Sequence, residues 1–284
     1  MQLSLIDVID DQLPNYKGKA IMIGLSGGIN SAAVLAYLSK FIEYQPDKLY
    51  LYHANFIEHS PDTLAFVDAC VDYARRKFPD VHYEQDDISL LAHFEEQKII
   101  YSPKFSGCTR MLKIAPMVEF MRRHDIAIDL VGYVRGEYAR IQRQIERGVE
   151  NKEYLISHLT NEDCFSLVAD EIGWYPDIYH LKWNDPRILP YVAQYRADLS
   201  DQQASIIERY ARRGYGYDGS TRVFKHNNCL PCKNMHQWEL FMLRIFYPGY
   251  YERAMQLAER MGGYWGRKDE STAGESSTCT VCAN

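Results

Sequence analysis

Short apolar runs alternate with amphipathic stretches along the first half of the chain. Residues 20–25 form a continuous apolar run that ends in a glycine-containing turn, which is typical of a strand buried on both faces. Over residues 31–41, apolar side chains recur at helical spacing. A strand, a tight turn and a helix in this order predict the start of a βαβ unit.

The alternation continues to about residue 145. Further strands are predicted at residues 49–55, 81–87 and 127–134. One helix is expected to begin after Ser60, a plausible N-cap, and to end near Phe78, and another to cover residues 113–124. Strands that alternate with helices predict an α/β, Rossmann-like parallel sheet with helices on both faces.

The pattern changes after residue 145. Helices are predicted over residues 200–213 and 236–261, the second with a break at Pro248. Residues 262–284 are polar and rich in Ser and Thr, apart from their cysteines. We therefore expect an α/β core over residues 1–145 and a mostly helical or irregular C-terminal region, carrying a cysteine cluster, over residues 146–284.

Composition narrows the class of protein. The chain has 284 residues, of which 46% are hydrophobic and 25% charged, as in an ordinary globular protein. No apolar run approaches the roughly 20 residues that cross a bilayer, and no basic cluster precedes an apolar run near the N-terminus. We expect a cytoplasmic protein without a membrane partner. The net charge of −6 argues against a broad nucleic-acid footprint.

The turn after the first strand carries the strongest chemical signal. Its glycines allow a tight turn and a close approach of the backbone to a ligand, and the helix that follows presents N–H groups to an anion. The loop lacks the lysine of a Walker A motif and the spacing of a dinucleotide loop. It is predicted to bind nucleotide phosphates through Leu25, Ser26, Gly27, Gly28, Ile29, Asn30 and Ser31.

This loop resembles the S-G-G-x-D-S loop of the PP-loop ATP pyrophosphatases, with Asn30 in place of the family's Asp. Four later blocks, at residues 55–64, 108–116, 132–143 and 214–232, resemble in order those of the phosphoadenylyl-sulfate (PAPS) reductase family. In the third block the arginine is shifted by one position and Tyr138 replaces the usual Ser. The chain is thus similar to that branch of the adenine nucleotide alpha hydrolase superfamily, which implies a HUP-type fold.

The resemblance implies an enzyme that binds ATP, or a related adenylyl nucleotide, with Mg²⁺. It would act at the α-phosphate, adenylating an acceptor for sulfur or nitrogen transfer and releasing pyrophosphate. Ligands of open α/β sheets lie at the carboxyl ends of the strands, and arginine pairs well with phosphate or sulfate oxygens. The expected catalytic residues are Ser31, Arg110, Lys113 and Glu137, and further nucleotide contacts are expected from Asn55, Gly132, Arg135, Arg140 and Arg143.

Two other functions remain open from the sequence. One is thiol-dependent reduction of phosphoadenylyl sulfate or adenylyl sulfate. The other is a non-catalytic protein that senses a nucleotide and binds a partner. The sequence does not identify the acceptor, which is a small molecule or a nucleic-acid base. It is also compatible with a homodimer.

Seven cysteines in a chain without a secretion signal argue against a disulfide framework. The resemblance implies a [4Fe–4S] cluster, although Gly107 replaces one family cysteine. The alternatives are a structural Zn²⁺ site made by the two C-x-x-C pairs and redox-active cysteines in the tail. The predicted cluster ligands are Cys108, Cys229, Cys232 and Cys282, with Cys164 and Cys279 as other choices for the fourth.

The remaining candidates are assigned no chemistry. His53 is expected to be a satisfied core histidine, and Cys70 an ordinary buried thiol. His93, His124 and His180 show no neighbours in the sequence that suggest a site.

Overall fold

The computed structural model describes residues 15–41, 43, 45–100, 107–216 and 219–266. As far as they are described, the residues form two compact units. The first comprises Met1–Ala54, Leu64–Asp86 and Ala115–Tyr175, and the second comprises Asn55–Thr63, Asp87–Ile114 and Pro176–Asn284. A division at residue 145 stays a prediction.

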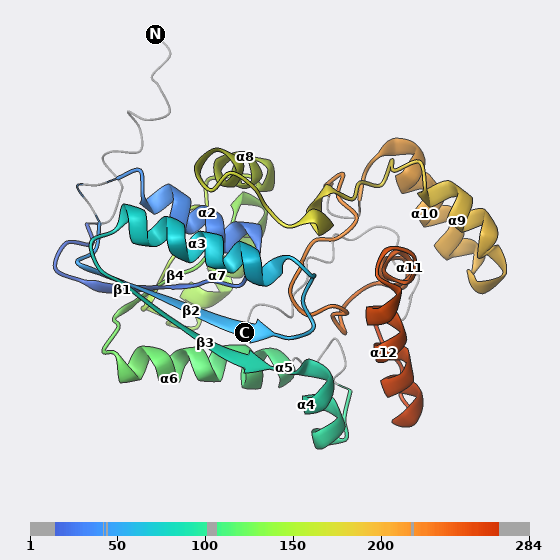
Figure 1. Ribbon diagram of the computed structural model, residues 1–284, viewed down its shortest axis with the longest axis horizontal. Coiled ribbons are helices and arrows are strands. Elements are labelled where there is room, and N and C mark those ends of the chain that lie inside the picture. Colours follow the sequence, from blue (N-terminus) through green and yellow to red (C-terminus); the bar gives the residue numbers. More distant parts are fainter. Residues whose placement is uncertain (1–14, 42, 44, 101–106, 217–218, 267–284) are drawn as a thin grey trace, which may run out of the picture. The chain divides into compact units, whose positions relative to one another are not determined.

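A five-stranded sheet organises the α/β part of the chain, with the strand order β3-β2-β1-β4-β5 (Figure 1). Strand β1 pairs in parallel with β2 and β4, and β4 pairs in parallel with β5. The bonds from Leu49 N–H to the Asp80 carbonyl and from Ile57 N–H to the Ile88 carbonyl keep one offset, so β3 is parallel as well. The predicted parallel sheet is confirmed; its strands are β1 (Ala20–Gly24), β2 (Lys48–Phe56), β3 (Val81–Ile88), β4 (Ile128–Leu130) and β5 (Lys152–Glu153).

Helices cover both faces of this sheet, as the alternating pattern predicts. Figure 1 shows α2 (Ile29–Leu38), α3 (Thr63–Lys77) and α8 (Asn161–Glu171) over one face and α6 (Ala115–Arg123) against the other. Aromatic side chains fill the layer beneath α6, because the strand positions facing it are large and apolar. This core cluster consists of Met22, Tyr50, Tyr52, Phe120, Met121 and Ile126.

Several predicted helices form with small shifts of their ends. The helix expected from residue 31 begins at Ile29, and the one expected from residue 113 follows a π-helical turn over Arg110–Ile114. The predicted helix over residues 200–213 is α10 (Asp201–Arg213), where the Ser200 side chain accepts the Gln203 N–H. The predicted break at Pro248 divides α11 (Gln237–Phe246) from α12 (Pro248–Arg260).

Other elements have no counterpart among the predictions. They include β5, which is two residues long, and α8, although Thr160 and Asp163 form a capping box at its start. The remaining helices are α4 (Leu90–Gln97), α5 (Gly107–Thr109), α7 (Tyr138–Glu146) and α9 (Ile188–Gln194), with 3₁₀ turns at Arg135–Glu137, Asp177–His180 and Arg196–Asp198. Among the helices of the described residues, none has both the length and the apolar character to cross a bilayer.

Candidate functional site

The loop that joins β1 to α2 is a sharp turn at the carboxyl end of the central strand. Leu25 is wholly buried, and its N–H donates to the Tyr52 carbonyl oxygen at 2.8 Å, which extends the sheet by one residue. Gly27 then takes a φ of +74°, a conformation that side chains disfavour. Gly28 returns to extended backbone as the N-cap of α2. The predicted strand–turn–helix unit is therefore present.

Two serines fix the shape of this loop from within. The Ser26 N–H donates to the Ser31 hydroxyl oxygen at 3.1 Å, and the Gly28 N–H donates to the Ser26 hydroxyl oxygen at 3.2 Å. The Ser31 hydroxyl donates in turn to the Gly28 carbonyl oxygen at 3.0 Å. Because these bonds close on themselves, the loop holds its curvature before any ligand binds.

The first turn of α2 is suited to an anion. The Ala32 N–H makes the first intrahelical bond, to Gly28, so the N–H groups of Ile29, Asn30 and Ser31 have no acceptor within the helix. Gly28 has no side chain that might cap them, and the first turn contains no acidic residue. The helix dipole adds a partial positive charge at this end. A phosphate group therefore fits the donor set, and Asn30 keeps the turn free of a carboxylate.

Gly132 packs directly against this turn. A Cβ atom at Gly132 would lie 2.9 Å from both the carbonyl carbon and the carbonyl oxygen of Asn30, and 3.2 Å from its Cβ. Only glycine permits this approach, because no side chain tolerates such short contacts with backbone. The structure thus brings together two residues that the sequence assigned to the nucleotide site.

The arginines of the first unit differ in their surroundings. Glu137 forms an ion pair with Arg140, and it also accepts the Val134 N–H at 3.3 Å. The Arg140 guanidinium lies 4.4 Å from the ring centroid of Tyr133, so it is held from two sides. Glu137 thus orients an arginine.

Arg135 and Arg143 are less constrained than Arg140. Arg135 is exposed, and its N–H donates to the Leu159 carbonyl at 2.8 Å. The Nη2 atom of Arg143 is buried and has no hydrogen-bond partner among the described residues. A buried guanidinium nitrogen of this kind favours an anionic ligand.

His53 is a core residue, as expected. Its ring is wholly buried in β2, and Nδ1 lies 2.6 Å from the carbonyl oxygen of Leu25. The histidine therefore contacts the residue at which the loop of residues 26–31 begins.

A second cluster forms within the other unit. Cys229 is almost fully buried. The charges of Lys113 and Cys108 both affect the pKa of its thiol. Burial raises the pKa of the Cys229 thiol, while hydrogen bonding and the charge of Lys113 lower it. The Lys113 ammonium also lies 4.8 Å from the ring centroid of Phe56. Three residues assigned a role from the sequence thus come together here.

The sequence of the C-x-x-C segment, residues 229–232, predicts the start of a helix, but none begins there. The helix α11 begins at Gln237, five residues after Cys232. His236 is its N-cap, and Glu239 accepts the His236 N–H at 2.9 Å. The helix starts at this capping box because it satisfies N–H groups at the helix N-terminus.

Glu58 ties this segment down, a role that the sequence does not reveal. Its carboxylate is 2% exposed and accepts the Ser89 hydroxyl at 2.7 Å and the Leu90 N–H at 2.8 Å, at the start of α4. The Leu230 N–H donates to the Glu58 backbone carbonyl. Glu58 therefore links the start of α4 to the chain beside Cys229.

The structure gives fewer contacts for the other residues that the sequence assigned to a site. Asn55 donates to Asp87 at 2.6 Å, while its buried Oδ1 has no hydrogen-bond partner among the described residues. Arg110 is exposed, and the Cys232 sulfur accepts the Asn234 N–H at 3.4 Å. The predicted ligand Cys282 lies outside the described residues.

A zinc ion and an iron–sulfur cluster require different spacings between their cysteine ligands. Thiolates on one zinc ion lie about 3.8 Å apart, whereas those on an iron–sulfur cube sit on different irons and are farther apart. Among the described residues, Cys108, Cys229 and Cys232 do not approach one another as ligands of one ion would. The zinc alternative needs Cys279 and Cys282, which are not described, so it stays a prediction.

Two other cysteines are buried within the first unit. Burial raises the pKa of the Cys164 thiol, in α8, to about 12. Cys70 is wholly buried in α3, and burial raises the pKa of its thiol as well, which confirms the expected inert thiol.

No family model and no curated protein matches this sequence. Among solved structures, the chain is similar to the U34-tRNA thiolase NcsA from Methanococcus maripaludis with its [4Fe-4S] cluster, at 12% identity and a TM-score of 0.39, over 97% of this chain and 82% of that one. It is also similar to the NH3-dependent NAD synthetase from Campylobacter jejuni in complex with a nitrate ion, at 11% identity and a TM-score of 0.38, over 75% of this chain and 90% of that one. The functional assignment therefore rests on the geometry of the site.

Proposed function

We propose that this chain binds an adenine nucleotide, ATP in the first instance, at the loop of residues 26–31 and acts at its α-phosphate. It would adenylate an acceptor for sulfur or nitrogen transfer and release pyrophosphate. The observation that carries the proposal is the self-bonded S-G-G turn in front of the α2 N-terminus, with Gly132 packed against Asn30. The ordered sequence blocks that resemble PAPS reductases support it.

The backbone of the loop has the main binding role in this proposal. Its N–H groups would hold the pyrophosphate part of the nucleotide, and the Ser31 hydroxyl would keep the turn in shape. Arg140, oriented by Glu137, and Arg143 would face the developing negative charge. Catalysis would come mainly from positioning and charge stabilisation, without a covalent step on the protein.

Arg110 and Lys113 belong to the second unit, and their role stays an expectation from the sequence. Lys113 and Arg110 would neutralise phosphate or sulfate oxygens, as their block in the sequence suggests. Mg²⁺ would lower the charge of the phosphates when bound with the nucleotide. The first turn of α2 offers no carboxylate, so the ion would be held chiefly by the nucleotide itself.

The cysteines are proposed to hold a [4Fe–4S] cluster through Cys108, Cys229, Cys232 and Cys282. Support comes from Cys108 and Lys113, which both act on the buried Cys229 thiol; the charge of Lys113 opposes the effect of burial, which raises the pKa of that thiol. Anaerobic purification with a metal count tests this part. A broad visible absorbance with about four irons per chain supports it; a colourless protein with one zinc supports the structural Zn²⁺ site instead.

The central proposal is tested with the full chain, ATP and Mg²⁺. Equilibrium binding of ATP is measured first, and pyrophosphate release is then followed alone and with candidate acceptors. We expect saturable ATP binding and acceptor-dependent pyrophosphate release. The absence of ATP binding would contradict the site itself.

The same assays separate the two other functions. ATP binding without turnover on any acceptor would favour a nucleotide sensor. Sulfite release from an adenylyl sulfate, lost in Cys279→Ser or Cys282→Ser with nucleotide binding intact, would favour the reductase.

A further inference from the structure

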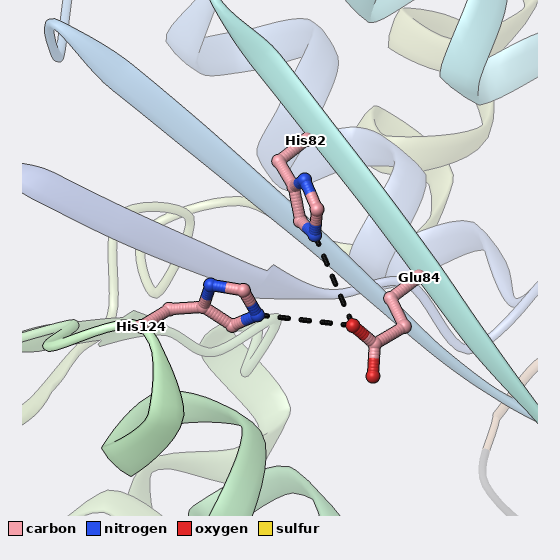
Figure 2. Close-up of side chains that lie close together, drawn as sticks. All are labelled: His82, Glu84 and His124. Atoms are coloured by element: carbon pink, nitrogen blue, oxygen red, sulfur yellow. Dashed lines mark ion pairs between the residues drawn. The ribbon is translucent and has the colours of Figure 1, made fainter.

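Two histidines and a glutamate meet on the face of the sheet that α6 covers. The Nε2 atoms of His82 and His124 lie 3.8 and 3.7 Å from the same Glu84 oxygen, Oε2 (Figure 2). One ligand atom from each residue lies within 4.8 Å of both others. Among the described residues, this is the only group of three His, Cys, Asp or Glu side chains that meets so closely.

The two histidine nitrogens lack ordinary partners. Both Nε2 atoms are buried and make no hydrogen bond among the described residues. Their distances to Glu84 are too long for hydrogen bonds, and leaving a buried polar atom unsatisfied costs roughly 1–3 kcal/mol. A shared ligand between the three side chains would satisfy both nitrogens and the carboxylate together.

Local structure aims these side chains at one point. His82 and Glu84 are two residues apart on the edge strand β3, so they project from the same face. His124 directly follows the end of α6. Its ring centroid lies 5.1 Å from that of Tyr50 and 4.7 Å from that of Phe120, and the His82 ring also contacts Tyr50, at 5.4 Å. This aromatic packing fixes the orientation of both imidazoles.

Arg123 fixes the glutamate in a similar way. Its Nη2 donates to the other carboxylate oxygen, Oε1, at 2.5 Å, which leaves Oε2 facing the histidines. The pairing with Arg123, together with the neighbouring histidines, lowers the pKa of the Glu84 carboxyl. One oxygen of the Glu84 carboxylate is thus held by Arg123, and the other lies beside both histidine nitrogens.

We propose that His82 Nε2, His124 Nε2 and Glu84 Oε2 bind one divalent transition-metal ion, with Zn²⁺ as the best match. Two imidazoles and a carboxylate suit Zn²⁺, whereas Mg²⁺ and Ca²⁺ prefer oxygen ligands alone. Ligands of a tetrahedral zinc lie about 3.4 Å apart, and the histidine nitrogens lie 3.8 and 3.7 Å from the Glu84 oxygen and within 4.8 Å of each other, so side-chain rotation would have to draw the group together. The side chains are 40%, 28% and 25% exposed for His82, Glu84 and His124, which lets water supply a fourth ligand.

The site is independent of the proposed nucleotide chemistry. His82 stands at the amino end of β3, whereas the phosphate loop follows the carboxyl end of β1, and these are opposite ends of parallel strands. A bound ion would link an edge strand to the end of α6. The proposed role is therefore to fasten this edge of the sheet.

Cobalt spectroscopy tests the site apart from the cysteines. The full chain is freed of metal with a chelator and titrated with Co²⁺, then with Zn²⁺. We expect one Co²⁺ per chain with visible d–d bands of a nitrogen and oxygen site, without thiolate-to-cobalt charge transfer, and displacement by Zn²⁺. Loss of an outer-shell partner costs roughly 10–100-fold in affinity, so we expect Glu84→Gln and His124→Gln to lose more than that.

A matched control is His93→Gln, which replaces another half-buried histidine outside the group and should leave the spectrum unchanged. Circular dichroism and melting of the metal-free variants confirm that they fold. The proposal is overturned if Co²⁺ gives only thiolate bands, if the nitrogen and oxygen spectrum persists in both variants, or if no Co²⁺ binds.

Discussion

The two proposed sites at opposite ends of the parallel sheet in the first unit use different kinds of ligand-binding groups. At the carboxyl end, the loop of residues 26–31 offers backbone N–H groups, and its few side chains serve mainly to hold the turn. At the amino end of β3, the group formed by His82, Glu84 and His124 offers only side-chain atoms. The backbone site depends on glycines and on a continuous stretch of sequence, while the side-chain site depends on packing between distant segments.

Their tolerance to substitution should differ accordingly. The loop leaves no room for a Cβ at Gly132, because Asn30 backbone already occupies that space. The histidine group is partly exposed, so its residues can be replaced without a clash against backbone. The following changes test the loop, the histidine group and the sheet that carries both.

The largest effect is expected for Gly132→Ala. Its Cβ would displace the turn at Asn30, and a shift of about 1 Å in a binding site can cost on the order of 100-fold in rate. We expect at least that loss in ATP binding or pyrophosphate release, measured by calorimetry and a coupled assay. Gly136→Ala is the matched control, since its Cβ would meet open space. Equal effects of the two substitutions would contradict the close packing.

Asp129→Asn tests β4, the strand that pairs with β1 in the same sheet. Asp129 is buried in β4, and burial raises its pKa from 3.8 to about 6, with Lys152 opposing the shift. The folded protein therefore loses stability as the pH rises from about 4 to above 6, where the buried carboxyl must ionise. A shift of about two units corresponds to roughly 3 kcal/mol.

We expect Asp129→Asn to raise the free energy of unfolding by up to about 3 kcal/mol at pH 8, with the gain vanishing near pH 4. Urea titrations at several pH values measure it. Asp72→Asn is the control, because that side chain is 65% exposed and pairs only with Arg75 across one turn. A pH-independent gain in Asp129→Asn would argue against the buried charge as its cause.

Zinc should stabilise the protein through the side-chain site. At a free concentration one hundred times its Kd, a ligand specific to the native state adds about 2.7 kcal/mol. We expect a matching rise in Tm for the full chain that is absent in His82→Asn, while pyrophosphate release is the same in both. A stabilisation that survives in His82→Asn would assign the ion to another site.

The smallest effect is expected for Ser31→Ala. It removes the acceptor of the Ser26 N–H and the bond to the Gly28 carbonyl, at a cost of about 1 kcal/mol in stability. Nucleotide affinity should fall as well, because the turn loses its shape. Ser89→Ala, at the N-cap of α4, should cost a similar stability without changing ATP affinity. Chemical denaturation and calorimetry of both variants separate the two contributions.

Sequence pattern predicted the elements whose signals are local. A few neighbouring residues are enough to predict each of them: the buried run of β1, the turn at Gly27 and Gly28, and the capping serine of α10. The break at Pro248 follows from the proline alone. By contrast, the two-residue strand β5 forms only because the edge of β4 needs a partner, and no pattern of two residues predicts that.

The candidate sites also differ in whether local sequence or tertiary packing forms them. The sequence by itself determined the turn of residues 26–31, since a chain that turns on glycines into a helix presents its N–H groups whatever surrounds it. Only the tertiary structure decided that Gly132 contacts Asn30, that Glu58 supports the Cys229 segment, and that His124 has His82 and Glu84 as neighbours. These contacts join residues far apart in the chain, and their geometry is fixed by how strands and helices pack rather than by the order of the residues.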